Sequence, residues 1–247
     1  QHPPAKWLVV TAFAIVYLVW GSTYLFIQIA IEDIPALLMA ALRYLLAGGV
    51  MLIWCLVRKE PVFVWRSIGP SLICGILLLS LGNGGVVWAE QYVPSSLAAV
   101  MVSSVPIWFV LMDRRNWRVN FTGRETITGL IIGFGGVLLL FSESARNAFS
   151  NMGNKNELMA AVVLILASVS WAVGSLFSKY RSTAGSSMVN TTWQMLMGGL
   201  ALLPMVYATN ETEGFAFSQV SARSWFALFY LISFGSIIGY TAYVWLL

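Results

Sequence analysis

The sequence predicts an all-α membrane protein, a multi-span helical bundle formed by an inverted repeat of five-helix units. Composition is the first observation behind this prediction: 59% of the 247 residues are hydrophobic and 10% are charged, against roughly 45–50% and 25% in soluble domains. The mean hydropathy is +0.80. A soluble domain of this length could not bury so much apolar surface, so the solvent of the outer surface must be lipid. The distribution of basic residues and a repeat of landmarks are the second and third observations.

Eight apolar runs are long enough to cross a bilayer. A spanning helix needs about 20 mostly apolar residues, and the runs cover 7–29, 35–57, 67–91, 95–112, 125–142, 157–178, 187–207 and 225–247. Pro35 and Pro94 stand where two of the helices begin, a position at which the missing N–H of proline costs nothing. Longer polar loops are expected over 142–156 and 208–224. The sequence therefore predicts eight spans with mostly short connections.

Basic residues alternate between the connections. If the N-terminus is cytoplasmic, the ten basic residues on the inner side are Lys6, Arg58, Lys59, Arg66, Arg114, Arg115, Arg118, Arg124, Lys179 and Arg181. Three lie outside, namely Arg146, Lys155 and Arg223. Cytoplasmic loops carry an excess of Lys and Arg, so we predict a multi-pass membrane protein with its N-terminus in the cytoplasm.

Landmarks of the first part of the chain recur roughly 150 residues later. Trp20 corresponds to Trp171, the Gly48–Gly49 pair to Gly198–Gly199, and Gly82–Asn83 to Gly235–Ser236. Because five spans separate the copies, the second enters the membrane from the opposite side, as in many secondary transporters with inverted repeats. We expect residues 1–150 to form one repeat of five spans. Residues 151–247 would form an incomplete second repeat of three, as a part of a ten-span protein.

Several segments resemble the EamA family of the drug/metabolite transporter superfamily. The segments are Trp20–Tyr24, Pro35–Tyr44, Ser95–Pro106, Gly129–Val137, Ser170–Ser175 and Phe234–Gly239. The branch that the chain is most similar to is that of the YedA-like and YddG-like permeases. The resemblance implies ten helices in two inverted repeats, location in the bacterial inner membrane and export of small metabolites. The chain departs from the family in lacking the ninth and tenth spans and in the linker 113–120.

Arg43 is the one basic residue within a span. It lies about eight residues into the second run, roughly 12 Å below the outer surface at 1.5 Å per residue. An unpaired cation facing lipid there costs at least ~2.5 kcal/mol, so Arg43 must face the protein interior or water. Two roles are open: a partner for a substrate carboxylate, or a structural bridge to helix-end carbonyls or to Glu90.

Polar residues at mid-depth form a second group of candidates. Such side chains bond between helices in lipid, but as a set they are too many for packing alone, and some should line a polar cavity. The candidates are Ser22, Thr23, Asn83, Ser103, Ser175, Gln194 and Ser236. Asn83 lies in the glycine-rich sequence Leu81–Gly85 and is the first candidate for a substrate ligand.

Tryptophan and proline supply the remaining candidates. Trp20 and Trp171 lie too deep for the usual interfacial role of tryptophan, so they, together with Trp88, are candidates for cavity walls; packing is the alternative. An aromatic wall would suit an amphipathic organic molecule. Pro106 follows two serines in the fourth run and can kink the helix, which makes it a candidate hinge, with a static bend as the alternative.

The sequence offers little material for catalysis. The only histidine, His2, is terminal, and no nucleophile–base pair, paired carboxylates or metal ligands lie within a span. Glu90, at the end of a span, is near the outer rim, and no acid lies deep in a run, where proton-coupled carriers usually have one. We therefore expect facilitated or exchange transport, or coupling through residues of the missing spans. We therefore predict a transporter, not an enzyme, that moves small organic metabolites such as amino acids by alternating access. A nucleotide-sugar carrier is the alternative. No cofactor, metal or nucleic acid is expected. The expected partners are a small-molecule substrate and membrane lipid. The protein is expected to be a monomer or a weak homodimer.

Overall fold

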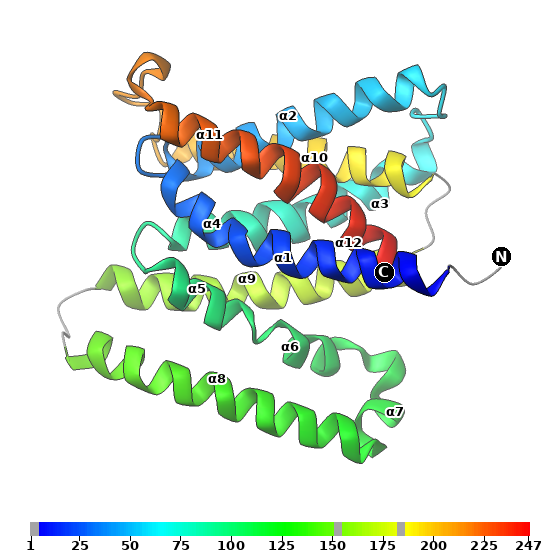
Figure 1. Ribbon diagram of the computed structural model, residues 1–247, viewed down its shortest axis with the longest axis vertical. Helices are drawn as coiled ribbons and strands as arrows, with labels where there is room; N and C mark the ends of the chain where they lie inside the picture. Colours follow the sequence, from blue (N-terminus) through cyan, green and yellow to red (C-terminus); the bar gives the residue numbers. More distant parts are fainter. Residues whose placement is uncertain (1–4, 151–154, 182–185) are drawn as a thin grey trace.

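A computed structural model of the protein describes residues 5–150, 155–181 and 186–247. His2 lies outside the described residues. Most side chains of residues 137–150, Arg146 among them, and the side chain of Lys155 are not described either. The described part is helical and contains no strand. Helices that lie roughly side by side form one bundle, and the first described helix begins at the same end of it as that at which the last one ends (Figure 1).

The first five predicted runs are helical. They correspond to α1 (Lys6–Ala30); α2 (Ala36–Val57); α3 (Trp65–Cys74), η1 (Gly75–Asn83) and α4 (Gly84–Ala89); α5 (Ser95–Val102) and α6 (Val105–Met112); and α8 (Arg124–Ser150). Two short helices connect α6 to α8, namely η2 (Arg114–Asn116) and α7 (Trp117–Thr122).

The remaining three runs are helical as well. They correspond to α9 (Lys155–Tyr180); α10 (Ser187–Ala208); and α11 (Ala222–Tyr230), η4 (Leu231–Tyr240) and α12 (Thr241–Leu246). The short helix η3 (Phe217–Gln219) lies between α10 and α11. Gly214, in the same connection, has a φ of 75°, in the left-handed region that favours glycine.

Six helical segments in the described part of the chain are long and apolar enough to cross a membrane, which makes this a multi-span helical membrane protein. They are Lys6–Ala30, Ala36–Val57, Ile68–Ala89, Ser95–Met112, Asn156–Tyr180 and Ala222–Leu246. The predicted spans 125–142 and 187–207 are helical but do not belong to this set, so the number eight stays a prediction. Large apolar side chains such as Leu18, Leu25 and Ile53 are exposed on the outside of the bundle, as lipid requires.

The loop predicted over 142–156 is wrong for its first part, because α8 continues to Ser150. The apolar run does end near Phe141, but loss of apolar character does not end a helix. Residues 142–150 contain neither Pro nor Gly and include the good helix formers Glu, Ala and Arg.

Helices from the two parts of the chain pack reciprocally. α1 runs toward one end of the bundle and α9 runs the opposite way (Figure 1). Where α2 crosses α10, a Cβ on Gly48 would lie 3.0 Å from the backbone N of Leu196, and one on Gly199 would lie 3.1 Å from that of Leu45. The numbers of the two glycines differ by 151, and so do those of the two leucines. The second contact is thus the first with the two helices exchanged, as in a two-fold symmetric interface.

Two of the long helical segments contain π-helical turns at comparable places. η1 spans nine residues in the middle of the third segment, and η4 spans ten in the middle of the last one. π-helical turns are rare and often mark functional sites. Here they contain Asn83 and Ser236, the residues matched to each other by the sequence repeat.

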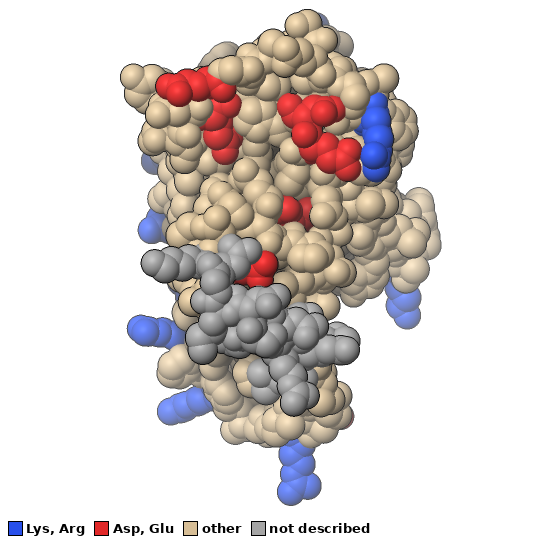
Figure 2. All heavy atoms as spheres, turned by 90° about the vertical axis from the view of Figure 1, so that its left-hand side faces the viewer, with Lys and Arg blue, Asp and Glu red and all other residues tan. Residues whose placement is uncertain are grey.

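The bundle has an acidic end, formed by the connections 31–35, 90–94 and 209–221 with Glu32, Asp33, Glu90, Glu211 and Glu213. Figure 2 shows acidic side chains gathered on this face. Contacts between distant segments hold the end together. Asp33 accepts hydrogen bonds from the Ser221 N–H at 3.0 Å and the Ser224 hydroxyl at 2.7 Å. Glu32 pairs with Arg223 at 3.2 Å, and the Leu38 N–H, at the start of α2, donates to Glu211 at 3.0 Å.

Candidate functional site

A cavity of about 100 Å³ lies in the middle of the bundle, between segments from both parts of the chain. Its wall is formed by α1, α2, η1, α4, α5, α6, α9 and η4. The lining residues are Trp20, Thr23, Tyr24, Ile27, Arg43, Tyr44, Leu79, Gly82, Asn83, Val86, Val102, Val105, Ala167, Ser168, Trp171, Gly235 and Tyr240. Five predicted site residues are among them: Trp20, Thr23, Arg43, Asn83 and Trp171.

Trp20 and Trp171 meet at this cavity. Their ring centroids are 5.3 Å apart and the rings are nearly perpendicular, at 86°, an arrangement that aromatic pairs favour. Each indole N–H is used: Trp20 donates to the Gly235 carbonyl at 3.3 Å, and Trp171 to the Tyr243 hydroxyl at 3.1 Å. The two tryptophans therefore join α1, α9, η4 and α12 at one point of the wall.

Arg43 is buried, with 3% of its surface exposed. Its Nε donates to the Ser236 hydroxyl at 2.8 Å, and its Nη1 to the Asn83 Oδ1 at 3.4 Å. A Cβ on Gly235 would lie 2.9 Å from Nη2, so this glycine leaves room for the guanidinium. No carboxylate of a described residue lies within the 4.0 Å of an ion pair. A guanidinium has five N–H donors, so Arg43 keeps donors for a ligand.

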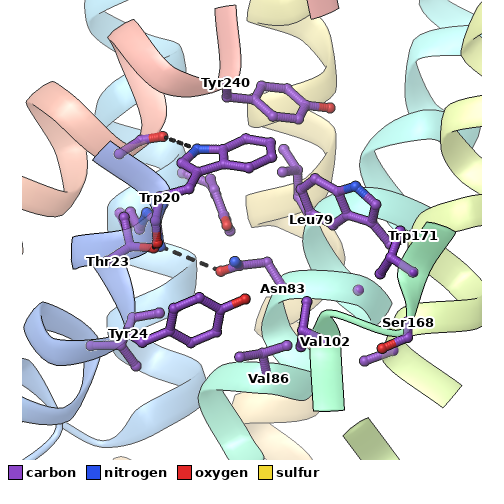
Figure 3. Close-up of a pocket in the computed structure, with 17 residues that line it drawn as sticks. Trp20, Thr23, Tyr24, Leu79, Asn83, Val86, Val102, Ser168, Trp171 and Tyr240 are labelled. Atoms are coloured by element: carbon purple, nitrogen blue, oxygen red, sulfur yellow. Dashed lines mark hydrogen bonds between the residues drawn. The ribbon is translucent and has the colours of Figure 1, made fainter. Parts of the chain in front are cut away.

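Aromatic side chains form much of the remaining wall. Figure 3 shows Asn83 between the ring of Tyr24 on one side and the rings of Trp20 and Tyr240 on the other, with Trp171 beside them. Tyr24, Tyr44 and Tyr240 were not among the predicted site residues. Tyr24 and Tyr44 fall within the segments that resemble the family, which is a signal that could have found them. No comparable signal pointed to Tyr240.

Two further predicted residues support the wall from behind. Gln194 accepts a hydrogen bond from the Tyr240 hydroxyl at 2.7 Å, and Ser236 is the acceptor for Arg43. Both are buried. They hold the tyrosine and the guanidinium in place, and a role in transport stays a prediction for each of them.

Like Gln194 and Ser236, four other predicted site residues do not line the cavity. Ser22 bonds to the Tyr230 hydroxyl at 2.7 Å, between α1 and α11. Ser175 bonds to the Tyr243 hydroxyl at 2.5 Å. Trp88 packs on Tyr92 with centroids 4.9 Å apart, and the exposed Ser103 donates to the Val100 carbonyl at 2.6 Å. Depth along a run is what suggested them, and depth does not say which way round a helix a side chain points.

The fourth segment is broken next to Pro106. α5 ends at Val102 and α6 begins at Val105, with Ser103 and Ser104 between them. The N–H of Ile107 bonds to the Ser104 carbonyl at 2.9 Å and so starts a new turn after the proline. Val102 and Val105, on either side of the break, line the cavity. Whether the break moves during transport stays a prediction.

The fold and the cavity define a class of protein: a multi-span helical membrane protein with a small interior chamber that is lined in part by aromatic side chains. A family model extends this result. The model of the EamA-like transporter family matches residues 7–142 and 158–247. The chain therefore belongs to the EamA-like transporter family, which confirms the resemblance seen in the sequence.

Relatives cover nearly the whole chain. An uncharacterized inner membrane transporter of Escherichia coli strain K12, YedA, is 34% identical over 232 residues, which are 94% of this chain and 71% of YedA. The uncharacterized transporter YoaV of Bacillus subtilis strain 168 is 24% identical over 93% of this chain and 75% of its own. These relatives and the spans make this protein an inner-membrane transporter.

One solved structure is similar in fold. A crystal structure titled only as that of a protein aligns with a TM-score of 0.55 at 16% identity. The alignment covers 94% of this chain and 78% of the other. At this identity the likeness concerns the fold alone.

Proposed function

We propose that this protein exports small organic metabolites that carry a carboxylate, such as amino acids, by alternating access, and that the cavity is the binding site. The buried Arg43 is the observation that carries the proposal. A cation in a lipid-enclosed interior is expensive unless it is paired or functional. Its hydrogen-bond partners among the described residues are two neutral side chains, so an anionic group of a ligand is the partner that its spare donors suit.

The walls of the cavity support an organic substrate. Indole and phenol rings offer apolar surface together with a few polar groups, which suits a molecule with an apolar part beside its carboxylate. A phosphorylated substrate such as a nucleotide sugar is less well served, because Arg43 is the one Lys or Arg side chain among the lining residues.

The arrangement of the two parts of the chain supports alternating access. The cavity lies between them, the contacts of α2 and α10 are reciprocal, and the family model matches in two segments. Inverted repeats provide two equivalent gates around a central site. The acidic end would form the outer gate and the opposite end the inner one, with the N-terminus in the cytoplasm.

A metabolite efflux screen tests the proposed function. Cells that overproduce the full-length protein should release one or a few carboxylate-bearing metabolites faster than control cells. Arg43→Gln should abolish this release at an unchanged amount of protein in the membrane, and Asn83→Ala should weaken it. Arg223→Gln removes an exposed arginine of the acidic end and serves as the matched control. Normal release by the Arg43→Gln variant would refute the assigned role.

A further inference from the structure

Glu90 is a buried carboxylate that the role proposed for the cavity leaves unused. It follows directly on α4 and has 4% of its surface exposed. Neither of its side-chain oxygens accepts a hydrogen bond from a described residue. A carboxylate removed from water without donors is costly. It is therefore a site that needs a positive partner, either a proton or a cationic group.

Glu90 belongs to the same side of its helix as the cavity. Leu79, Asn83 and Val86 line the cavity, and Glu90 follows Val86 by four residues, which places it one turn further along that side. The charge of Glu90 also interacts with Arg43 and Tyr24, which both line the cavity. The carboxylate thus belongs to the part of the acidic end that is nearest to the cavity.

Few other groups near Glu90 can titrate. The elements packed against α4 are α2, η1 and α9. α2 presents Arg43 and Tyr44, η1 contains no titratable side chain, and α9 faces α4 with apolar residues such as Val163 and Ala167. The described acid of α9, Glu157, is in the first turn of that helix. α1 adds Tyr24, and Tyr92 follows Glu90 in the chain.

We propose that Glu90 binds the ammonium group of a zwitterionic substrate whose carboxylate binds Arg43, and that a proton takes the place of this ammonium group when the substrate leaves. This inference rests on the proposed function and names its substrate class, α-amino acids, and its coupling ion. A guanidinium in the cavity wall and a carboxylate one helical turn beyond it are the two charges that a zwitterion requires.

A proton fits Glu90 better than a metal cation. Sodium or calcium would need several oxygen ligands, and among the described residues no three His, Cys, Asp or Glu side chains are placed to share an ion. The apolar neighbours Val86, Ala89 and Val93 add no side-chain ligand.

The ammonium group of the substrate and a proton compete for the carboxylate of Glu90, so transport is an exchange of substrate for proton. An amino acid leaves with Glu90 ionised, and the return step brings one proton inward on the neutral carboxyl group. Each cycle therefore exports one zwitterion of no net charge and imports one proton, so one positive charge enters. A proton gradient directed into the cell would drive export.

The test uses the full-length protein in liposomes that contain an equimolar mixture of L-amino acids, with the lumen corresponding to the cytoplasm. Release is measured by mass spectrometry, with the medium either at the luminal pH or one unit more acidic, and luminal acidification is followed with a pH-sensitive dye. The wild-type protein should release amino acids several-fold faster with the gradient and acidify the lumen. Glu90→Gln should lose both effects. Liposomes that contain 2-oxo acids, which lack the ammonium group, in place of the amino acids should show no coupled proton entry.

Control variants separate the possible outcomes. Glu90→Asp keeps the carboxylate and should keep coupling, and Glu213→Gln removes an exposed acid of the acidic end and should change nothing. Coupling that persists in Glu90→Gln overturns this inference while the proposed function stands. Failure of the wild-type protein to release any amino acid also overturns this inference, and the proposed function falls with it only if the efflux screen finds no other carboxylate-bearing metabolite. A monodisperse elution profile in detergent shows that each variant is folded.

Discussion

At the scale of single residues, Arg43 is the centre of a small polar cluster in an otherwise apolar interior. It reaches Asn83 from η1 and Ser236 from η4, and Gly235 gives it space. The sequence indicated Arg43 and Asn83 because a polar group deep in a span must face protein or water. It did not indicate Tyr24, Tyr44 or Tyr240, since tyrosine occurs both in cores and at membrane surfaces, and its place in a run does not distinguish the two.

The hydrogen bond from Arg43 to Ser236 can be tested directly. Bonds to charged groups contribute about 1.5–3 kcal/mol, so Ser236→Ala should misplace the guanidinium and raise the KM of transport about tenfold or more. Ser22→Ala removes a similar hydroxyl that bonds to Tyr230 outside the cavity, and its KM should stay near that of the wild type. Equal KM values for the two variants would contradict this role of Ser236.

At the scale of elements, the apolar runs predicted where the helices lie, because length and composition decide what crosses lipid. They did not predict the π-helical turns, whereas Pro106 did predict a kink in the fourth run, where α5 and α6 are separated. A run that is apolar on all sides has no polar stripe, and therefore its sequence shows no period from which a change of helix type could be read. The extension of α8 was missed for a related reason, since polarity marks the edge of lipid and not the end of a helix.

The packing of α2 on α10 gives a prediction for stability. Gly48→Ala would place a methyl group 2.9 Å from the side chain and 3.0 Å from the backbone N of Leu196, and overpacking of this kind costs about 1–3 kcal/mol. Its neighbour supplies the control: a Cβ on Gly49 meets nothing within 4 Å. Gly49→Ala should be neutral or gain about 0.5–1 kcal/mol. Melting temperatures in detergent should rank Gly49→Ala at or above the wild type and Gly48→Ala below it.

The contact of Asp33 with α11 predicts a pH dependence. Hydrogen bonds from the Ser221 hydroxyl, the Ser224 hydroxyl and the Ser221 N–H lower the pKa of Asp33 below 3.8, against a smaller opposing effect of desolvation. A lowered pKa stabilises the folded protein above pH 3.8 and ceases to do so as the pH falls through the lowered value. Asp33→Asn should therefore reduce the melting temperature at pH 7, and the difference from the wild type should shrink below pH 3.8. A difference independent of pH would contradict this account.

At the scale of the whole molecule, charge is divided between the two ends. The acidic end contains one described basic side chain, Arg223, and the opposite end contains the basic residues of the connections after α2, α6 and α9. This division supports a cytoplasmic N-terminus through the excess of Lys and Arg in cytoplasmic loops.

Cysteine labelling tests this orientation. The two native cysteines, Cys55 and Cys74, are buried, so they give little background with a bulky reagent. In spheroplasts, a membrane-impermeant maleimide should react with a Glu213→Cys variant. An Arg118→Cys variant should react only after lysis. The reverse pattern would show that the N-terminus is outside.

The bonds of Arg43 have a consequence for motion. The guanidinium links the π-helical turns of η1 and η4 through its hydrogen bonds. The two segments therefore cannot slide past each other while both bonds are intact. A substrate that binds the guanidinium weakens this link between η1 and η4. Under the proposed function, we expect the empty protein to be the stiffer form, so that it rarely rearranges without substrate and leakage across the membrane is limited.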